Sequence, residues 1–237
     1  REIDMLPKIA TPKYDMIVPS TGKSITYRPY VVKEEKILLI ALESEDEKQI
    51  EKSIYSMIES CLDGKVNIND FTNFDIEFIF LTLRSMSVGE GIKLNIPCSS
   101  CEEPNEVSVD LNKLEVKNND FDKKDLQIKI NDDITIDLRW PTMSDRAVEI
   151  TSGTEAVIHM VAKSIGTLYH GEDIISMSDT PFSEVLEFVE SLSSAQFNQC
   201  MQVLVKTPYT GYDIKFTCKK CGHKNERELK GMADFFQ

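Results

Sequence analysis

The first third of the sequence combines β-prone runs with helical periodicity. Two β-prone runs, 14–18 and 24–30, flank a turn rich in Pro, Ser and Gly, and this predicts a hairpin. Apolar residues then recur at spacings of three and four over 32–44 and 47–62, which predicts two amphipathic helices. A third helix, over 73–86, is apolar around nearly its whole circumference. Such a helix belongs in the centre of a core or an interface.

After Gly89 the pattern changes to short strands. Strands are expected at 92–97, 106–111, 126–130 and 134–140. The last two alternate apolar and polar residues on either side of a short polar turn, so they are predicted to pair as a hairpin.

The last third of the sequence is expected to be mainly helical. A mixed segment, 143–165, is predicted to form a helix with an interruption, and two further helices are predicted to be capped by Thr180 and Ser194. Two strands, around 213–217 and 224–229, close the chain. No internal repeat or low-complexity tract stands out.

Composition and charge narrow the function classes. The chain has 237 residues, of which 41% are hydrophobic and 28% charged, so it can bury one or two globular cores. A net charge of -13 opposes tight binding to nucleic acid and favours a protein partner. The longest apolar run, 37–42, is far shorter than the roughly 20 residues of a membrane span. The first residues do not resemble a secretory signal, so a cytoplasmic origin is expected, although the initial Arg1 indicates a longer or processed chain.

Four of the six cysteines form two Cys-x-x-Cys pairs, Cys98 with Cys101 and Cys218 with Cys221. Each pair lies in the bend of a predicted hairpin, as in a zinc ribbon. A tetrahedral Zn²⁺ site needs four soft ligands, and a two-residue spacer lets both thiolates of a pair reach one ion. The sequence therefore predicts a structural zinc site at these four cysteines.

The spacing between the pairs is unusual, because 116 residues lie between Cys101 and Cys218. Compact ribbons have roughly 15 to 20 residues there. The metal would close a large loop, and its role would be stability and geometry. Gly222 suits the left-handed backbone that often follows such a pair, whereas Glu102 holds the equivalent place in the first pair. Four thiolates leave no open coordination position, so catalysis at the metal is not expected.

Other interpretations of the cysteines remain open. Two redox-active pairs, two structural disulfides, or unrelated thiols would fit the same spacing. His223 could also replace one thiolate as a ligand. Cys61 and Cys200 fall on apolar helix faces and are expected in the core.

No catalytic motif is complete. Thr21-Gly22-Lys23-Ser24 resembles the end of a P-loop, but Ile17 stands where the first glycine is required. His159 and His170 have no evident nucleophile as partner. The chain is therefore expected not to be an enzyme.

Six segments within about the first 90 residues carry a family resemblance: 6–7, 12–14, 19–23, 27–39, 74–81 and 84–90. Together they resemble the baseplate hub subunit and hub assembly family of T4-like contractile-tailed bacteriophages. The resemblance implies a non-enzymatic structural or assembly role in the hub, with other baseplate proteins, or a second copy, as partners. It also implies a location in the host cytoplasm during assembly and in the tail baseplate of the virion.

A partner-binding surface is predicted next to the first helix, with an aromatic anchor and charged residues at its rim. Its residues are Arg28, Tyr30, Lys33, Glu34, Glu35 and Lys36. The alternative is that Arg28 and Tyr30 only complete the local fold.

The expected architecture is α+β. An N-terminal hairpin and helical region, 1–90, precedes a split zinc ribbon formed by 91–112 and 209–231, with a mixed α+β lobe, 113–208, inserted between its halves. Two alternative functions remain: a transient hub-assembly chaperone that is absent from the mature virion, and a zinc-ribbon factor associated with nucleic acid or transcription.

Overall fold

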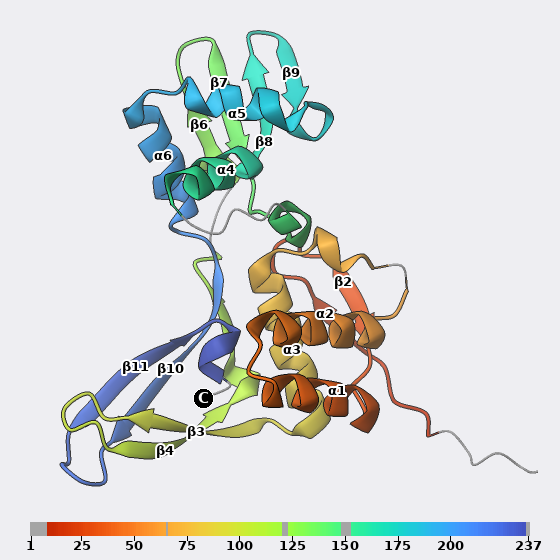
Figure 1. Cartoon of the computed structure of the whole chain (residues 1–237), viewed down its shortest axis with the longest axis vertical. Helices are drawn as coiled ribbons and strands as arrows, with labels where there is room; N and C mark the ends of the chain where they lie inside the picture. The colour runs from red at the N-terminus through yellow and green to blue at the C-terminus, as the bar shows by residue number, and fades with distance from the viewer. Residues whose placement is uncertain (1–8, 65, 120–122, 148–152, 236–237) are drawn as a thin grey trace, which may run out of the picture. The chain divides into compact units, whose positions relative to one another are not determined.

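The computed structural model is an α+β protein that divides into two compact units (Figure 1). The residues that it describes are 9–64, 66–119, 123–147 and 153–235. The first unit comprises Arg1–Ile68, Asp75–Leu114 and Tyr212–Gln237. The second comprises Asn69–Phe74 and Glu115–Gly211. The first unit thus joins the N-terminal region to the C-terminal strands, whereas the predicted three-part division remains a prediction.

The first unit begins with the predicted hairpin. Strands β1 (Tyr14–Ile17) and β2 (Ser24–Tyr27) pair antiparallel, with Tyr14 opposite Tyr27. The second strand is shorter than predicted, because the N–H of Arg28 donates to the carbonyl of Cys61, 2.9 Å away. The chain therefore leaves the hairpin and enters the helices at this point.

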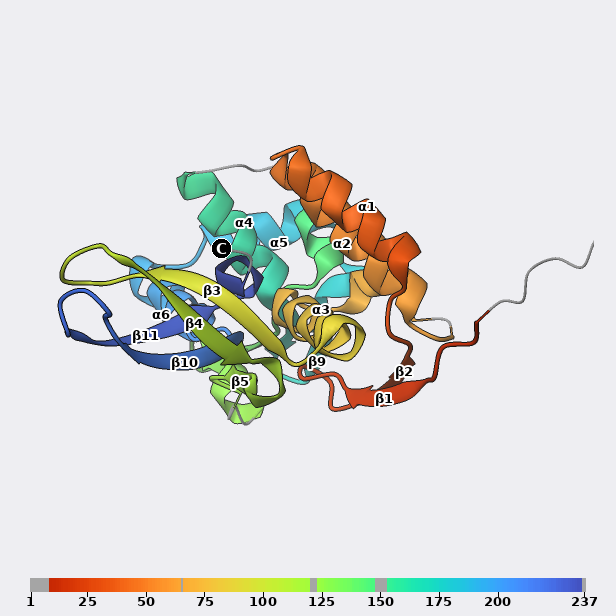
Figure 2. The same ribbon diagram turned by 90° about the horizontal axis from the view of Figure 1, so that it is seen from below.

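The three predicted N-terminal helices are present as α1 (Val32–Glu43), α2 (Glu47–Cys61) and α3 (Asn73–Val88). Helices α1 and α2 lie side by side (Figure 2). Helix α3 is central, as predicted, and its fully buried side chains include Ile76, Ile79, Phe80, Leu81 and Leu83.

The buried carboxylate of Asp75 in α3 has a hydrogen-bond partner. It accepts the N–H of Ser20, 2.9 Å away. This bond helps to compensate for the loss of hydration on burial, and it ties the β1–β2 turn to α3.

Two long hairpins complete the first unit. One consists of β3 (Gly91–Pro97) and β4 (Pro104–Asp110), and the other of β10 (Tyr209–Thr217) and β11 (Lys224–Lys230). Alternate residues of β3 and β4 are buried, as the pleat of a half-buried strand requires. The two hairpins lie beside each other in Figures 1 and 2.

The second unit contains a four-stranded antiparallel sheet of order β6-β7-β8-β9. Its strands are β6 (Gln127–Lys129), β7 (Ile134–Leu138), β8 (Ile165–His170) and β9 (Asp173–Ser176). Its helices are α4 (Thr154–Ser164), α5 (Phe182–Glu190) and α6 (Ser194–Leu204). One apolar core joins sheet and helices, and Cys200 is fully buried within it, as predicted. A further short strand, β5 (Glu115–Lys117), pairs with the start of β10.

The predicted helix over 143–165 is only partly correct. The structure has a 3₁₀ turn at Met143–Ala147 and helix α4, whereas residues 148–152 lie outside the described part of the chain. Strand β8 begins directly after α4 and forms an unpredicted hairpin with β9, turning at Gly171 with a φ of 60°. A short apolar run after a helix cannot be assigned by periodicity alone.

Two predicted helix caps are also corrected. The Thr180 hydroxyl donates to the carbonyl of Ser176, 3.0 Å away, and α5 begins only after Pro181. The N-cap of α6 is Ser193 rather than Ser194, because Ser193 accepts the N–H of Gln196. Pro181 thus holds the N-cap position of α5 in place of Thr180, and Ser193 holds that of α6 in place of Ser194.

Within the described ranges, none of the helices combines the length and apolarity needed to cross a membrane.

Candidate metal centre

The four predicted metal ligands lie together in the first unit. The first knuckle, 98–101, joins β3 to β4, and the second knuckle, 218–221, joins β10 to β11. The sulfur atoms of Cys98 and Cys221 lie 3.7 Å apart, as do those of Cys101 and Cys218. All four sulfurs lie within 4.8 Å of one another. A tetrahedral Zn²⁺ site with Zn–S bonds of about 2.3 Å would separate its sulfurs by about 3.8 Å, so the cluster fits such an ion.

Both knuckles close in the same way. The N–H of Glu102 donates to the carbonyl of Cys98 over 2.9 Å, and the N–H of Gly222 donates to that of Cys218 over 3.0 Å. The residues after the pairs share a left-handed backbone, with φ of 60° at Glu102 and 72° at Gly222. Glutamate therefore adopts in the first knuckle the conformation that glycine adopts more easily in the second.

Two asparagines that the sequence analysis did not single out also touch the cluster. The side-chain amide of Asn105 lies 3.6 Å from the sulfur of Cys218, and that of Asn225 lies 3.5 Å from the sulfur of Cys98. Each asparagine follows the second cysteine of its own pair by four positions. That shared spacing was the available signal.

The electrostatics of the thiols favour a bound cation. The pKa of Cys218 is lowered to about 6. The largest cause is the hydrogen bond from the backbone N–H of Cys221, which outweighs the opposite effect of burial. At Cys101 the N–H of Glu103 lowers the pKa, but the neighbouring sulfurs and burial together raise it to about 12. The Cys101 thiol therefore resists ionising beside the other sulfurs, because like charges repel, and a divalent cation would remove that resistance.

Two lysines around the knuckles have acidic partners. Lys220 lies 2.6 Å from Glu103, which links the two knuckles, and Lys215 lies 3.0 Å from Glu226 across the second hairpin. These pairs are exposed, so each contributes little stability. They do partly neutralise the basic stretch that a nucleic acid would need.

Three of the predicted partner-binding residues point inward. The Arg28 guanidinium donates to the carboxylate of Glu34 and to the carbonyl of Ser60, each 2.9 Å away. Glu34 is buried and also accepts the N–H of Val31, at the start of α1. Tyr30 is only 7% exposed. These contacts belong to the local fold, and a partner-binding role of the same residues stays a prediction.

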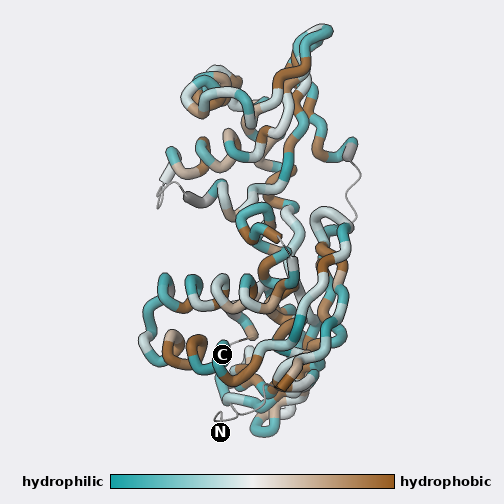
Figure 3. The backbone as a smooth tube through the Cα atoms, turned by 90° about the vertical axis from the view of Figure 1, so that its right-hand side faces the viewer, coloured by the Kyte–Doolittle hydropathy of each residue, from teal (hydrophilic) through white to brown (hydrophobic). Residues whose placement is uncertain are grey.

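The remaining predicted residues lie at the surface of α1. Lys33 and Lys36 are exposed, whereas Glu35 is partly buried. Four apolar side chains of the same helix are also exposed, although the sequence analysis did not place them on a surface; we call them the α1 apolar face. They are Val32, Ile37, Leu39 and Ile40, with exposed fractions of 76%, 48%, 53% and 55%. In Figure 3, which colours the backbone by hydropathy, this helix combines hydrophilic and hydrophobic turns.

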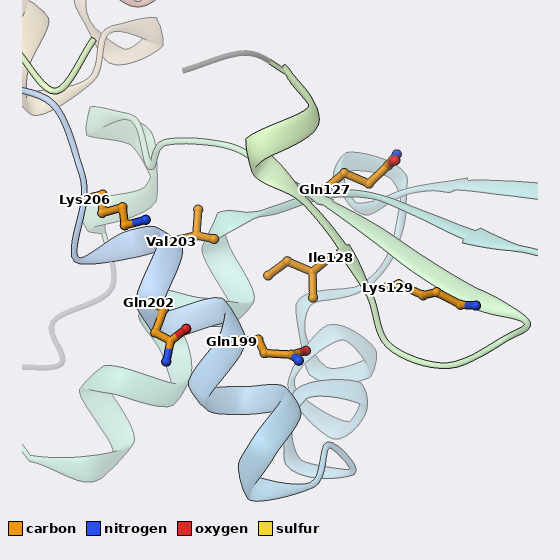
Figure 4. A pocket seen from close by; sticks show the side chains of 7 residues that line it. All are labelled: Gln127, Ile128, Lys129, Gln199, Gln202, Val203 and Lys206. Atoms are coloured by element: carbon orange, nitrogen blue, oxygen red, sulfur yellow. The ribbon is translucent and has the colours of Figure 1, made fainter. Parts of the chain in front are cut away.

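A shallow groove of about 380 Å³ lies between β6 and α6 in the second unit (Figure 4). It is lined by Gln127, Ile128, Lys129, Gln199, Gln202, Val203 and Lys206. None of these seven residues carries a carboxylate, an imidazole or a thiol. The groove therefore offers side-chain amides and the two ammonium groups of Lys129 and Lys206 as polar contacts.

The fold and the cysteine cluster define an α+β protein with a split ribbon of the zinc-ribbon type, whose halves come from distant parts of the chain. The chain belongs to the family described as T4 bacteriophage base plate protein, whose model matches residues 11–237. No curated protein and no solved structure gives a significant match. Membership of this family indicates a structural role in the tail baseplate of the virion, with other phage baseplate proteins as partners.

Proposed function

We propose that the chain is a non-enzymatic structural or assembly subunit of the baseplate hub, held in shape by one structural Zn²⁺. Membership of the baseplate family and the resemblance of the first 90 residues to hub proteins support this role. The observation that carries the metal assignment is the convergence of four sulfurs from knuckles more than a hundred residues apart.

The ligands of the ion would be Cys98, Cys101, Cys218 and Cys221. Bound Zn²⁺ would neutralise thiolate charge and cross-link the two hairpins. Four protein ligands complete a tetrahedral shell, so the ion would leave no position for water or substrate. The cross-link would close the long loop that contains most of the second unit, and it would therefore restrain the unfolded chain more than the folded one.

The α1 apolar face would dock onto a neighbouring hub protein. Several exposed aliphatic side chains on one helix are typical of a surface that a partner covers. Lys33 and Lys36 are exposed on the same helix, so its partner should present an apolar patch that also carries acidic residues. Arg28, Tyr30 and Glu34 would support this surface from below by fixing the start of α1.

Co-expression with the other hub proteins tests the role. A stable complex that contains this chain and zinc would support the proposal, and failure to join any hub complex would contradict it. Mass spectrometry of purified virions separates a permanent subunit from a transient chaperone, because only the former persists in the particle. Assembly would take place in the host cytoplasm in either case.

A further inference from the structure

The two knuckles form a concealed repeat. Each follows the pattern Cys-x-x-Cys-x-x-x-Asn, ending at Asn105 in the first hairpin and at Asn225 in the second. Equivalent backbone bonds close both turns: the N–H of Cys98 donates to Glu103 over 2.9 Å, and that of Cys218 donates to His223 over 2.8 Å. The resemblance therefore extends from sequence spacing to hydrogen bonding.

The two asparagines make the same contacts, but each makes them to the opposite hairpin. Asn105 donates to the sulfur of Cys218 over 3.6 Å and accepts the backbone N–H of Lys219 over 3.0 Å. Asn225 donates to the sulfur of Cys98 over 3.5 Å and accepts the backbone N–H of Ser99 over 2.9 Å. Each amide thus makes two hydrogen bonds to the opposite knuckle. One is to the sulfur of its first cysteine, and the other is to the backbone N–H of the residue after that cysteine.

Each amide is also fixed within its own hairpin. Asn105 donates to the carbonyl of Glu103 over 2.7 Å, and Asn225 donates to that of His223 over 3.1 Å. The side chains are only 2% and 5% exposed. Buried amides with their hydrogen bonds satisfied have one orientation, so they can transmit a defined position from one hairpin to the other.

We propose that Asn105 and Asn225 are positioning residues of the metal centre, each orienting the first cysteine of the opposite knuckle. The inference rests on the proposed metal site. Hydrogen bonds to thiolate sulfur spread its negative charge and restrict its rotation, and both effects favour a tetrahedral shell. The hairpins would thus be aligned before the ion binds, rather than only by the ion.

The test uses the full chain, with Zn²⁺ affinity measured by chelator competition and Co²⁺ as a spectroscopic probe. Asn105→Ala and Asn225→Ala should each weaken Zn²⁺ binding by about 10- to 100-fold. The thiolate-to-cobalt absorption should move to longer wavelength in both variants, because a sulfur that loses a hydrogen bond gives up its electron more easily. Asn95→Ala, an exposed position on β3, is the matched control and should change neither quantity.

A second substitution separates the acceptor contact of Asn105 from its donor contacts. Asn105→Asp keeps an oxygen that can accept the N–H of Lys219, but it replaces the donor to Cys218 and to the carbonyl of Glu103 with a negative oxygen. Binding should therefore weaken at least as much as in Asn105→Ala. Unchanged affinity in the aspartate variant would overturn the contact to sulfur, even if the alanine variant is impaired or folds poorly.

The outcomes distinguish the inference from the metal site itself. If the unaltered chain shows no thiolate-to-cobalt absorption, the proposed metal site is wrong. If that absorption is present and neither asparagine variant changes it or the Zn²⁺ affinity, the site stands and the positioning role is wrong.

Discussion

The sulfur of Cys101 lies 3.7 Å from that of Cys218, although the two residues are 117 positions apart in the sequence. This contact joins the end of the chain to its middle. Any cross-link at this point removes more freedom from the unfolded chain than a local one would, because loop-closure entropy grows with loop length. The cysteine cluster should therefore affect the stability of the whole first unit.

Cys218→Ser should abolish tight metal binding and lower the melting temperature. The serine hydroxyl is a poor substitute for a thiolate, and the other three ligands cannot complete the shell. Metal analysis and thermal unfolding measure the two effects. Cys200→Ser is the matched control, since Cys200 is buried in the core of the second unit and is not one of the four clustered cysteines. It should lower stability without changing the metal content, and loss of metal there would contradict the assignment.

Metal binding should release protons at neutral pH. The pKa of Cys101, raised to about 12 by the neighbouring sulfurs and burial, keeps this thiol protonated in the metal-free protein. Zn²⁺ must displace that proton, so affinity falls as the pH falls. Titration calorimetry in buffers of different ionisation enthalpy counts the protons released. A proton count of zero at pH 7 would contradict coordination by the thiolates.

Arg28→Ala should destabilise the fold rather than only weaken assembly. Glu34 is buried, and removal of its partner would leave a buried charge, at a cost of about 3 kcal/mol. Urea unfolding of the purified chain measures the loss. Lys36→Ala removes an exposed charge of the same helix and should leave the stability nearly unchanged. Equal stability of both variants would show that the ion pair is unimportant.

The same ion pair should make stability depend on pH. Burial raises the pKa of Glu34, but the bonds from Arg28 and the backbone of Val31 outweigh burial and hold this pKa below its ordinary value of 4.5. The stabilisation is therefore present above pH 4.5 and is lost as the pH falls through the lowered pKa. Unfolding measured between pH 3 and pH 6 should show a smaller decline in Arg28→Ala than in the unaltered chain.

The α1 apolar face should matter for assembly and not for folding. Leu39 is 53% exposed, whereas its neighbour Leu38 is 4% exposed. Leu39→Ser should leave the melting temperature nearly unchanged and reduce incorporation into hub complexes. Leu38→Ser should lower the melting temperature, by the mechanism of large-to-small core substitutions. Normal assembly of Leu39→Ser would exclude Leu39 as a contact of the docking surface.

Sequence patterns predicted the parts of this protein that local chemistry determines. The apolar circumference of α3 predicted its burial, and the Cys-x-x-Cys spacing predicted two knuckles that the structure brings together. The β8–β9 hairpin was missed because β8 continues directly from α4 without a break in the pattern. The inward position of Tyr30 was not predicted, because it depends on contacts with residues that are distant in the sequence.

The asparagines show a further limit. Asn105 and Asn225 are ordinary polar residues of two hairpins, and their importance emerges only when each meets the opposite knuckle. The common spacing of the two hairpins is visible in the sequence, but it is too short to form a long repeat.

Native mass spectrometry of the full chain, together with metal analysis, tests the central claim most directly. The expected result is one Zn²⁺ bound per chain, released by acid and absent from Cys218→Ser. A chain that carries no metal while all four cysteines react freely with a thiol reagent, or that carries two disulfides instead, would contradict the metal-centred structure.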